Sequence, residues 1–175
     1  MARLKTDLRA RGDGGREAKA VVFSQFVTFI DIAQKSVEAA GFRCVRLTGG
    51  VSAAGREKCI REFQSPDADS PDVIFVSLKA GGVGINLTAA SFVYMLDPWW
   101  NPAVENQATD RAYRIGQTNR VMVHKFITSG SVEEKIDRMI REKSRLAEDV
   151  IGSGEDWLGS LGGDQLRDLV ALEDT

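Results

Sequence analysis

The residues best suited to chemistry lie in a short polar stretch around position 110. From Gln107 to Gln117 the spacing of the polar residues predicts a helix with one charged face. Arg111 and Arg114 stand about one turn apart on that face. Because guanidinium groups keep their charge and donate paired hydrogen bonds, two of them suit a polyanion such as a nucleotide triphosphate. The stretch alone leaves open a solvated helix face with an Asp110–Arg114 ion pair.

The elements that must position these arginines alternate between apolar runs and amphipathic helices. The apolar runs predict strands at residues 20–23, 42–47, 73–76, 92–96 and 121–127. Helices are predicted at residues 4–10, 29–40, 52–63 and 107–117, and from Ser131 to a stop at Gly152. Strands that alternate with helices predict an α/β domain with a mostly parallel sheet.

Polar residues follow four of the predicted strands directly. They are Ser24–Gln25, Thr48–Gly49, Ser77–Lys79 and Asp97–Pro102. In a parallel sheet the C-terminal ends of the strands share one edge, and ligands bind beyond that edge. The sequence therefore predicts a site there, with Asp97 itself expected to hold a turn.

The chain lacks the usual parts that grip and split a triphosphate. Glycines 81, 82 and 84 follow a strand, but no Gly-Lys-Ser/Thr follows them, so they are not a phosphate-cradling P-loop. No acidic pair follows a strand in the manner that holds magnesium. Arginines without these partners are expected in half of an active site, the other half lying elsewhere.

Length, composition and charge indicate which classes of protein the sequence fits. The 175 residues, 43% hydrophobic and 27% charged, are typical of one globular domain. A net charge of −2 predicts no strong non-specific attraction to nucleic acid, although it allows a local basic groove. Cys44 and Cys59 form no metal or disulfide pattern and are expected to be buried, and His124, the sole histidine, is expected in a strand. No metal site is predicted, and the absence of a long apolar run predicts a cytoplasmic protein without a membrane partner.

Five stretches resemble the second RecA-like lobe of Swi/Snf-type ATPases of the bacterial and archaeal kind. These are relatives of superfamily-two helicases that translocate on double-stranded DNA. In chain order the stretches are AVVFSQF (20–26), 47–56, SLKAGGVGINLT (77–88), DPWWNP (97–102) and QATDRAYRIGQ (107–117). The resemblance implies a RecA-like parallel sheet flanked by helices at 19–150, a lead-in or linker at 1–18, and a helical C-terminal brace at 151–175. Leu78 departs from the threonine of many eukaryotic members, so a contact from that hydroxyl is absent.

The resemblance also implies roles for individual residues. Arg114 is similar to the arginine finger that reaches a γ-phosphate across a cleft, and Arg111 to its catalytic neighbour. Positions that match nucleotide contacts are Gly84 and Asn86, near the ribose, and Gln107 and Asp110, which orient the arginines. Positions that match contacts with the DNA backbone are Ser24, Gln25, Gly49, Arg56, Ser77 and Lys79. Trp100 and Asn101 match a motif linked to DNA contact and to coupling between hydrolysis and movement, although Trp100 could equally be a packing residue.

These matches predict the second motor lobe of an ATP-dependent DNA translocase. ATP and magnesium would be held mainly by a first lobe that this chain does not contain, so the isolated chain is expected to be inactive. The predicted partners are double-stranded DNA, the first lobe in the same polypeptide, and an unidentified DNA-bound protein, in the nucleoid of a prokaryote. Two alternatives stay open: a non-catalytic docking module that kept the fold, and the lobe of an RNA-directed helicase.

Overall fold

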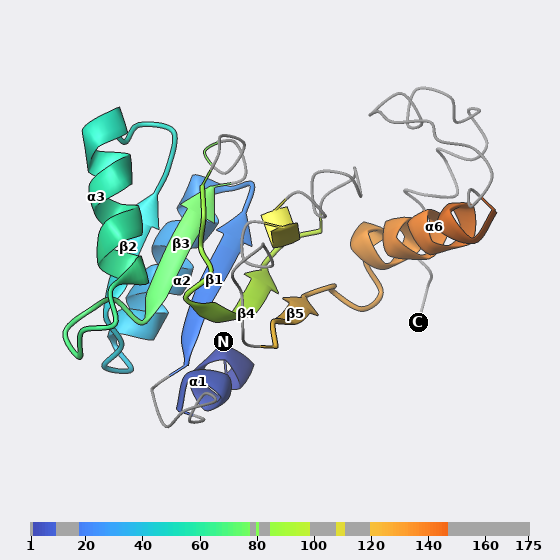
Figure 1. Cartoon of the computed structure of the whole chain (residues 1–175). Coiled ribbons are helices and arrows are strands. Elements are labelled where there is room, and N and C mark those ends of the chain that lie inside the picture. The colour runs from blue at the N-terminus through green and yellow to red at the C-terminus, as the bar shows by residue number, and fades with distance from the viewer. Residues whose placement is uncertain are drawn as a thin grey trace.

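The computed structural model describes residues 2–9, 18–77, 80, 85–98, 108–110 and 120–146, with the backbone alone for 141–146. Within these residues one sheet is flanked by helices (Figure 1). The strands are β1 Lys19–Ser24, β2 Cys44–Leu47, β3 Val73–Ser77, β4 Ala90–Met95 and β5 Met122–Lys125. The helices are α1 Ala2–Arg9, α2 Val27–Glu38, α3 Ala53–Gln64 and α6 Val132–Leu146.

The five strands are ordered β2-β3-β1-β4-β5, and every neighbouring pair is parallel. Each parallel pair requires a crossover connection. Helix α2 lies between β1 and β2, and helix α3 lies between β2 and β3. This architecture confirms the predicted α/β, RecA-like class. Within the described residues the other predicted elements are also found, with small shifts, while most of the predicted helix at 107–117 lies outside them. Strand β2 begins at Cys44 because Arg43 instead bonds Asp72, its backbone N–H lying 2.7 Å from a carboxylate oxygen.

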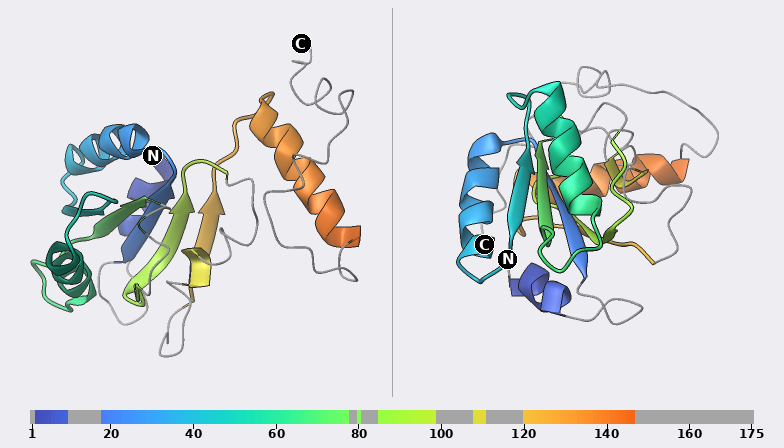
Figure 2. Two further views of the ribbon diagram at one scale, coloured as in Figure 1. Left: turned by 90° about the horizontal axis from the view of Figure 1, so that it is seen from above. Right: turned by 60° about the vertical axis from the view of Figure 1, so that its left-hand side comes forward.

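The two faces of the sheet bury two separate apolar clusters. On β1, Val21 and Phe23 belong to the cluster that includes Phe63 of α3, whereas Ala20 and Val22 belong to the cluster that includes α2. This alternation is the period of two that a strand imposes on its side chains. Figure 2 shows α2 and α3 on opposite faces of the sheet. Both faces are therefore covered, as a parallel sheet requires.

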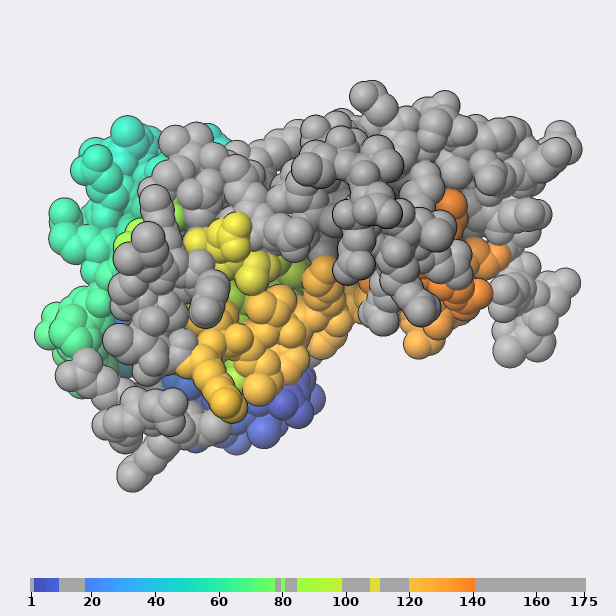
Figure 3. All heavy atoms as spheres, turned by 45° about the vertical axis from the view of Figure 1, so that its right-hand side comes forward, coloured from blue at the N-terminus to red at the C-terminus, as the bar shows by residue number. Residues whose placement is uncertain are grey.

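Helix α1 packs against the α2 side of the sheet rather than standing clear of it. Leu4 and Leu8, one turn apart, are 1% and 2% exposed. Between them Asp7 accepts a hydrogen bond of 2.5 Å from the Tyr94 hydroxyl and lies 3.2 Å from Nε2 of His124. Figure 3 shows residues of β5 and of the following segment at the surface beside α1. His124 lies in a strand as predicted; the division of the chain at residue 18 stays a prediction.

A glycine follows α2 and a serine precedes α6 where the sequence predicts, while the predicted stop at Gly152 lies outside the described residues. Gly41 has φ +90°, a conformation that suits a residue without Cβ, and its N–H bonds the Glu38 carbonyl at 2.9 Å just past α2. Ser131 precedes α6, and its hydroxyl accepts the Glu133 N–H at 3.1 Å. Glu134 reaches back to the N–H of Gly130 at 2.8 Å, one residue earlier than a standard capping box.

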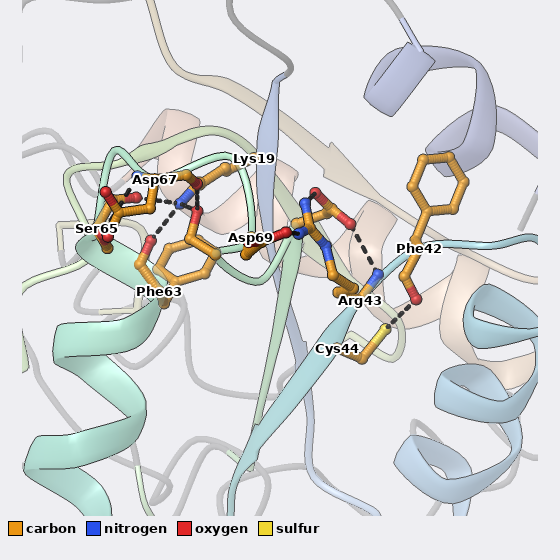
Figure 4. Close-up of polar contacts among 10 residues, drawn as sticks. Lys19, Phe42, Arg43, Cys44, Phe63, Ser65, Asp67 and Asp69 are labelled. Carbon is orange, nitrogen blue, oxygen red and sulfur yellow. Dashed lines mark hydrogen bonds and ion pairs between the residues drawn. The ribbon is translucent and has the colours of Figure 1, made fainter.

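The N-terminal edge of the sheet is held by internal polar contacts (Figure 4). The Lys19 ammonium donates to the carbonyls of Phe63 and Ser65, both at 2.7 Å, and to the Ser70 hydroxyl at 2.6 Å. Burial lowers the pKa of Lys19, against the raising effect of the Asp72 carboxylate. All three donors of this ammonium are used to fix α3 and the loop after it. This edge therefore offers no free cation from Lys19 to a ligand.

Candidate functional site

Four of the predicted site residues lie together at the C-terminal edge of the sheet. Ser24 and Ser77 are register partners at the ends of β1 and β3. Gln25 follows Ser24, and Gly49 comes two residues after the end of β2, which pairs with β3. Parallel pairing thus gathers residues that are far apart in the sequence, as predicted.

The accessibility of these four residues differs. Ser24 is 0% exposed and Ser77 is 3% exposed. The Ser24 oxygen accepts the Phe26 N–H at 3.0 Å, so this hydroxyl holds the turn that leads into α2. Gly49 is exposed and Gln25 is partly exposed. At this edge Gly49 and Gln25 are therefore the predicted residues that a large ligand can reach.

Gln25 joins the end of β1 to the segment that follows β4. Its backbone N–H donates to Oδ2 of Asp97 at 2.9 Å, and its side-chain amide donates to the Pro98 carbonyl at 2.9 Å. Asp97 is only 6% exposed. The predicted turn role of Asp97 thus takes a specific form, in which its carboxylate ties two strand ends together.

Opposing effects act on the pKa of the Asp97 carboxyl, and the net shift is upward. Burial raises the pKa of its carboxyl above the usual 3.8, while hydrogen bonds from Ser24 and Gln25 act in the lowering direction. The Glu133 carboxylate, a like charge, adds to the rise in pKa. The folded state therefore binds a proton at Asp97 more readily than the unfolded chain does.

A second group of predicted residues lies on the face of the sheet that α3 covers. Asn86 is exposed, between Ile85 and Leu87, which are buried in the cluster of that face. Ala108, 7% exposed, belongs to the same cluster. Residues 108–110 are helical, and Asp110 is exposed. The segments that carry Asn86 and Asp110 are therefore anchored over the same face.

Arg56 of α3, predicted to face the DNA backbone, also has an internal partner. Its Nη1 donates to the Ala80 carbonyl at 2.7 Å. One of its five N–H donors is thereby committed to the segment that follows β3. The remaining donors are compatible with a phosphate contact, which stays a prediction.

Sequence reasoning missed Gln64, the last residue of α3. Its Oε1 accepts the Ala89 N–H at 2.7 Å, and its Nε2 donates to the Asn86 carbonyl at 3.0 Å and to Thr88 Oγ1 at 3.2 Å. The only available signal was a polar residue that follows the buried Phe63, a pattern too common to single it out.

Several predicted residues lie outside the described residues, and their roles stay predictions. They are Lys79, Gly84, Trp100, Asn101, Gln107, Arg111 and Arg114. The C-terminal brace at 151–175 also lies outside them.

The described thiols and carboxylates do not form a reactive or metal-binding group. Both cysteines are free and partly, rather than fully, buried. Burial raises the pKa of Cys44 to about 12 and also raises that of Cys59, so both are thiols at neutral pH. Among the described residues no three His, Cys, Asp and Glu side chains are placed to hold a metal ion. Within the same ranges no helix is long and apolar enough to cross a membrane.

The parallel sheet and the polar edge define a RecA-like lobe. The chain belongs to the helicase conserved C-terminal domain family, which matches residues 4–116, and within it to the SWI2/SNF2 type. The C-terminal domain of the Sulfolobus solfataricus SWI2/SNF2 ATPase is 34% identical, with a TM-score of 0.72 over 99% of this chain and 67% of that one. The core of the same ATPase in complex with double-stranded DNA is 39% identical, with a TM-score of 0.72 over 90% of this chain and 32% of that one.

Longer proteins contain a similar stretch. The human helicase-like transcription factor is 43% identical over 148 residues, which cover 85% of this chain and 14% of that protein. The protein YwqA of Bacillus subtilis is 40% identical over 176 residues, which cover 100% of this chain and 18% of that protein. The chain therefore spans less than a fifth of the length of these relatives.

Proposed function

We propose that this chain is the second motor lobe of an ATP-dependent translocase on double-stranded DNA. The observation that carries the proposal is the pairing of two facts. The chain keeps Arg111 and Arg114 in a family of helicase C-terminal domains, and it lacks a P-loop lysine and an acidic pair for magnesium. A lobe with these features supplies half of a nucleotide site and needs a first lobe to complete it.

Arg114 acts as the arginine finger in this proposal, and Arg111 supports it. ATP supplies the phosphoanhydride bond whose hydrolysis drives movement. Each guanidinium places fixed positive charge where negative charge develops on the phosphoryl oxygens, and arginine fingers contribute roughly 10³–10⁵ in rate. Closure of the two lobes brings this charge to the phosphates, and reopening lets the lobes step along the duplex.

The described residues fit contacts with a nucleotide sugar better than coordination of a metal. Asn86 presents an exposed amide, with donors and an acceptor, on a segment anchored by buried neighbours. Asp110 is exposed over the same face. We therefore assign the ribose contact to Asn86 with Gly84, the orientation of the arginines to Gln107 and Asp110, and magnesium to the first lobe.

The DNA track lies along the C-terminal edge of the sheet. Among the predicted residues that the structure describes at this edge, Gly49 and Gln25 are the accessible ones, and we assign Arg56, Lys79, Trp100 and Asn101 to the same track. Ser24 and Ser77 are buried, and the N–H groups of Gln25 and Phe26 already donate to Asp97 and to Ser24. Among the predicted residues of this edge, the exposed Gly49 and the side chain of Gln25 are therefore the better candidates for direct contact with phosphates. Contacts with the DNA backbone do not depend on the base sequence, which is what a translocase requires. The structure of the Sulfolobus relative in complex with double-stranded DNA supports this choice of partner.

The test compares the isolated chain with a two-lobe protein that contains it. We expect the isolated chain to hydrolyse no ATP and the two-lobe protein to be stimulated by duplex DNA. Turnover by the isolated chain would contradict the half-site. Stronger stimulation by RNA than by duplex DNA would favour an RNA-directed lobe, and no turnover in either form would favour a docking module.

A further inference from the structure

Helix α3 holds the segment between β3 and β4 at both ends. Arg56 and Gln64 are eight residues apart, about two helical turns, so they lie near the same face of α3. Arg56 donates to the Ala80 carbonyl at 2.7 Å, near the start of the segment. Gln64 bonds three groups between Asn86 and Ala89, at its end.

The contacts of Gln64 use both ends of its amide. The acceptor oxygen takes the Ala89 N–H at 2.7 Å, and the donor nitrogen reaches the Asn86 carbonyl at 3.0 Å and Thr88 Oγ1 at 3.2 Å. An amide that donates and accepts in this way fixes the orientation of the backbone it contacts, because neither end can exchange with the other without losing bonds. Gln64 is only partly exposed. Water therefore cannot replace all three hydrogen bonds without a cost in free energy.

The backbone that Gln64 fixes is the backbone that presents Asn86. Ile85 and Leu87, on either side, are buried at 2% and 0% exposure, whereas Asn86 is exposed. The buried neighbours set the depth of the segment, and the Gln64 bond to the Asn86 carbonyl sets how this residue is turned. A group held from both sides is preorganised, so less ordering is needed when a ligand binds.

We propose that Gln64 is a positioning residue that orients Asn86 for the nucleotide sugar, with Arg56 anchoring the other end of the same segment. This inference rests on the proposed function, because it takes Asn86 as a nucleotide contact. It adds a residue of α3 that acts through Asn86 rather than by its own contact with the nucleotide. It also gives Arg56 a second role, since one helix then holds both the DNA-facing and the nucleotide-facing ends of the segment.

The test uses the two-lobe protein and two substitutions at Gln64. Gln64→Leu removes all three hydrogen bonds at similar volume. Gln64→Glu keeps the acceptor for the Ala89 N–H and loses the donor to Asn86. The matched control is Gln34→Leu on α2, where the side-chain amide donates to Glu38 of the same helix at 2.7 Å.

We expect Gln64→Leu to raise the KM for ATP on the order of tenfold, the size of about one lost hydrogen bond, with a smaller change in kcat and in affinity for duplex DNA. Gln64→Glu should raise the KM by a similar factor, because it loses the bond to Asn86. Hydrogen exchange at the amides of residues 86–89 should be faster in Gln64→Leu. Gln34→Leu should change none of these quantities.

Two results would overturn the inference: an unchanged KM for ATP in a folded Gln64→Leu or Gln64→Glu protein, or unchanged exchange at residues 86–89. If Gln64→Leu does not fold, Gln64→Glu decides by the same KM comparison. A wild-type two-lobe protein without DNA-stimulated turnover would contradict the proposed function instead. In that case the exchange rates alone decide whether Gln64 holds this segment.

Discussion

Single side chains at the C-terminal edge divide into those that hold the edge and those that can meet a ligand. Asp97 and Ser24 are buried and bond neighbouring backbone N–H groups. Gly49 is exposed, and a Cβ built on it meets no atom within 4 Å. The first two are therefore tested by stability, and Gly49 is tested by ligand binding.

Gly49→Ala should separate fold from function at this edge. Because the added methyl group meets nothing, the free energy of unfolding should change by less than about 0.5 kcal/mol. If DNA backbone approaches Gly49 closely, the affinity for duplex DNA should fall several-fold in the two-lobe protein, measured by fluorescence anisotropy. Gly50→Ala is the matched control, since its Cβ also meets no atom within 4 Å. Equal DNA affinity in both variants and the wild type would remove Gly49 from the DNA track.

Asp97→Asn should change how stability depends on pH. Burial raises the folded-state pKa of Asp97 above the usual 3.8, so protonation favours the folded state. That contribution is complete below about pH 4 and is lost as the pH rises through the folded-state pKa. Asp97→Asn has no such proton. The difference between its free energy of unfolding and that of the wild type should therefore shift in favour of the variant between about pH 4 and pH 7.

Urea unfolding at several pH values measures this difference. Asp69→Asn is the control, because Asp69 is an exposed carboxylate in the loop before β3. A constant difference between Asp97→Asn and the wild type across this pH range would show that the Asp97 pKa is not raised on folding.

Among the elements, α1 is the one whose packing the sequence indicates least. Its leucines are one turn apart, but the rest of the helix is polar, so the pattern predicts a helix without predicting what it covers. The structure places it on the sheet through Leu4, Leu8 and the buried Asp7. The Tyr94 hydroxyl is the donor of the shortest contact to Asp7, at 2.5 Å.

Tyr94→Phe should loosen α1 without disturbing the strands. Burial and the Asp7 hydrogen bond raise the pKa of Tyr94, so its hydroxyl stays a donor at neutral pH. Removing it leaves the 7%-exposed Asp7 without that donor and should cost about 1–3 kcal/mol of folding free energy, measured by urea unfolding. In an Asp7→Asn background the cost of Tyr94→Phe should be smaller. The same cost in both backgrounds would mean that the two side chains are not coupled.

Local patterns explain why the strands and helices could be predicted and the contacts between them could not. The period of two in β1 and the glycine after α2 are readable from neighbouring residues. The bond from Gln25 to Asp97 joins residues 72 apart, and that from Gln64 to Asn86 joins residues 22 apart. Such contacts depend on how the elements pack, and several different polar residues at either position would fit the same local pattern.

As a whole, the molecule is one side of a cleft in the function that we propose. The family match covers residues 4–116, and the relatives are more than five times as long as this chain. We propose that the polar edge, the α3 face and the arginine stretch meet a nucleotide and a duplex that a first lobe helps to hold. In this division of roles the chain contributes charge to phosphoryl transfer, and the first lobe grips the phosphates.

Arg114→Ala in the two-lobe protein tests this division of roles, with nucleotide affinity and turnover measured separately. We expect DNA-stimulated kcat to fall on the order of 10³-fold or more, while the Kd for ATP changes only a few-fold, because the first lobe binds most of the nucleotide. Arg120→Ala, which replaces an exposed arginine before β5, should leave both quantities unchanged. Wild-type turnover in Arg114→Ala, or a loss of ATP binding as large as the loss of turnover, would contradict the proposed role of Arg114.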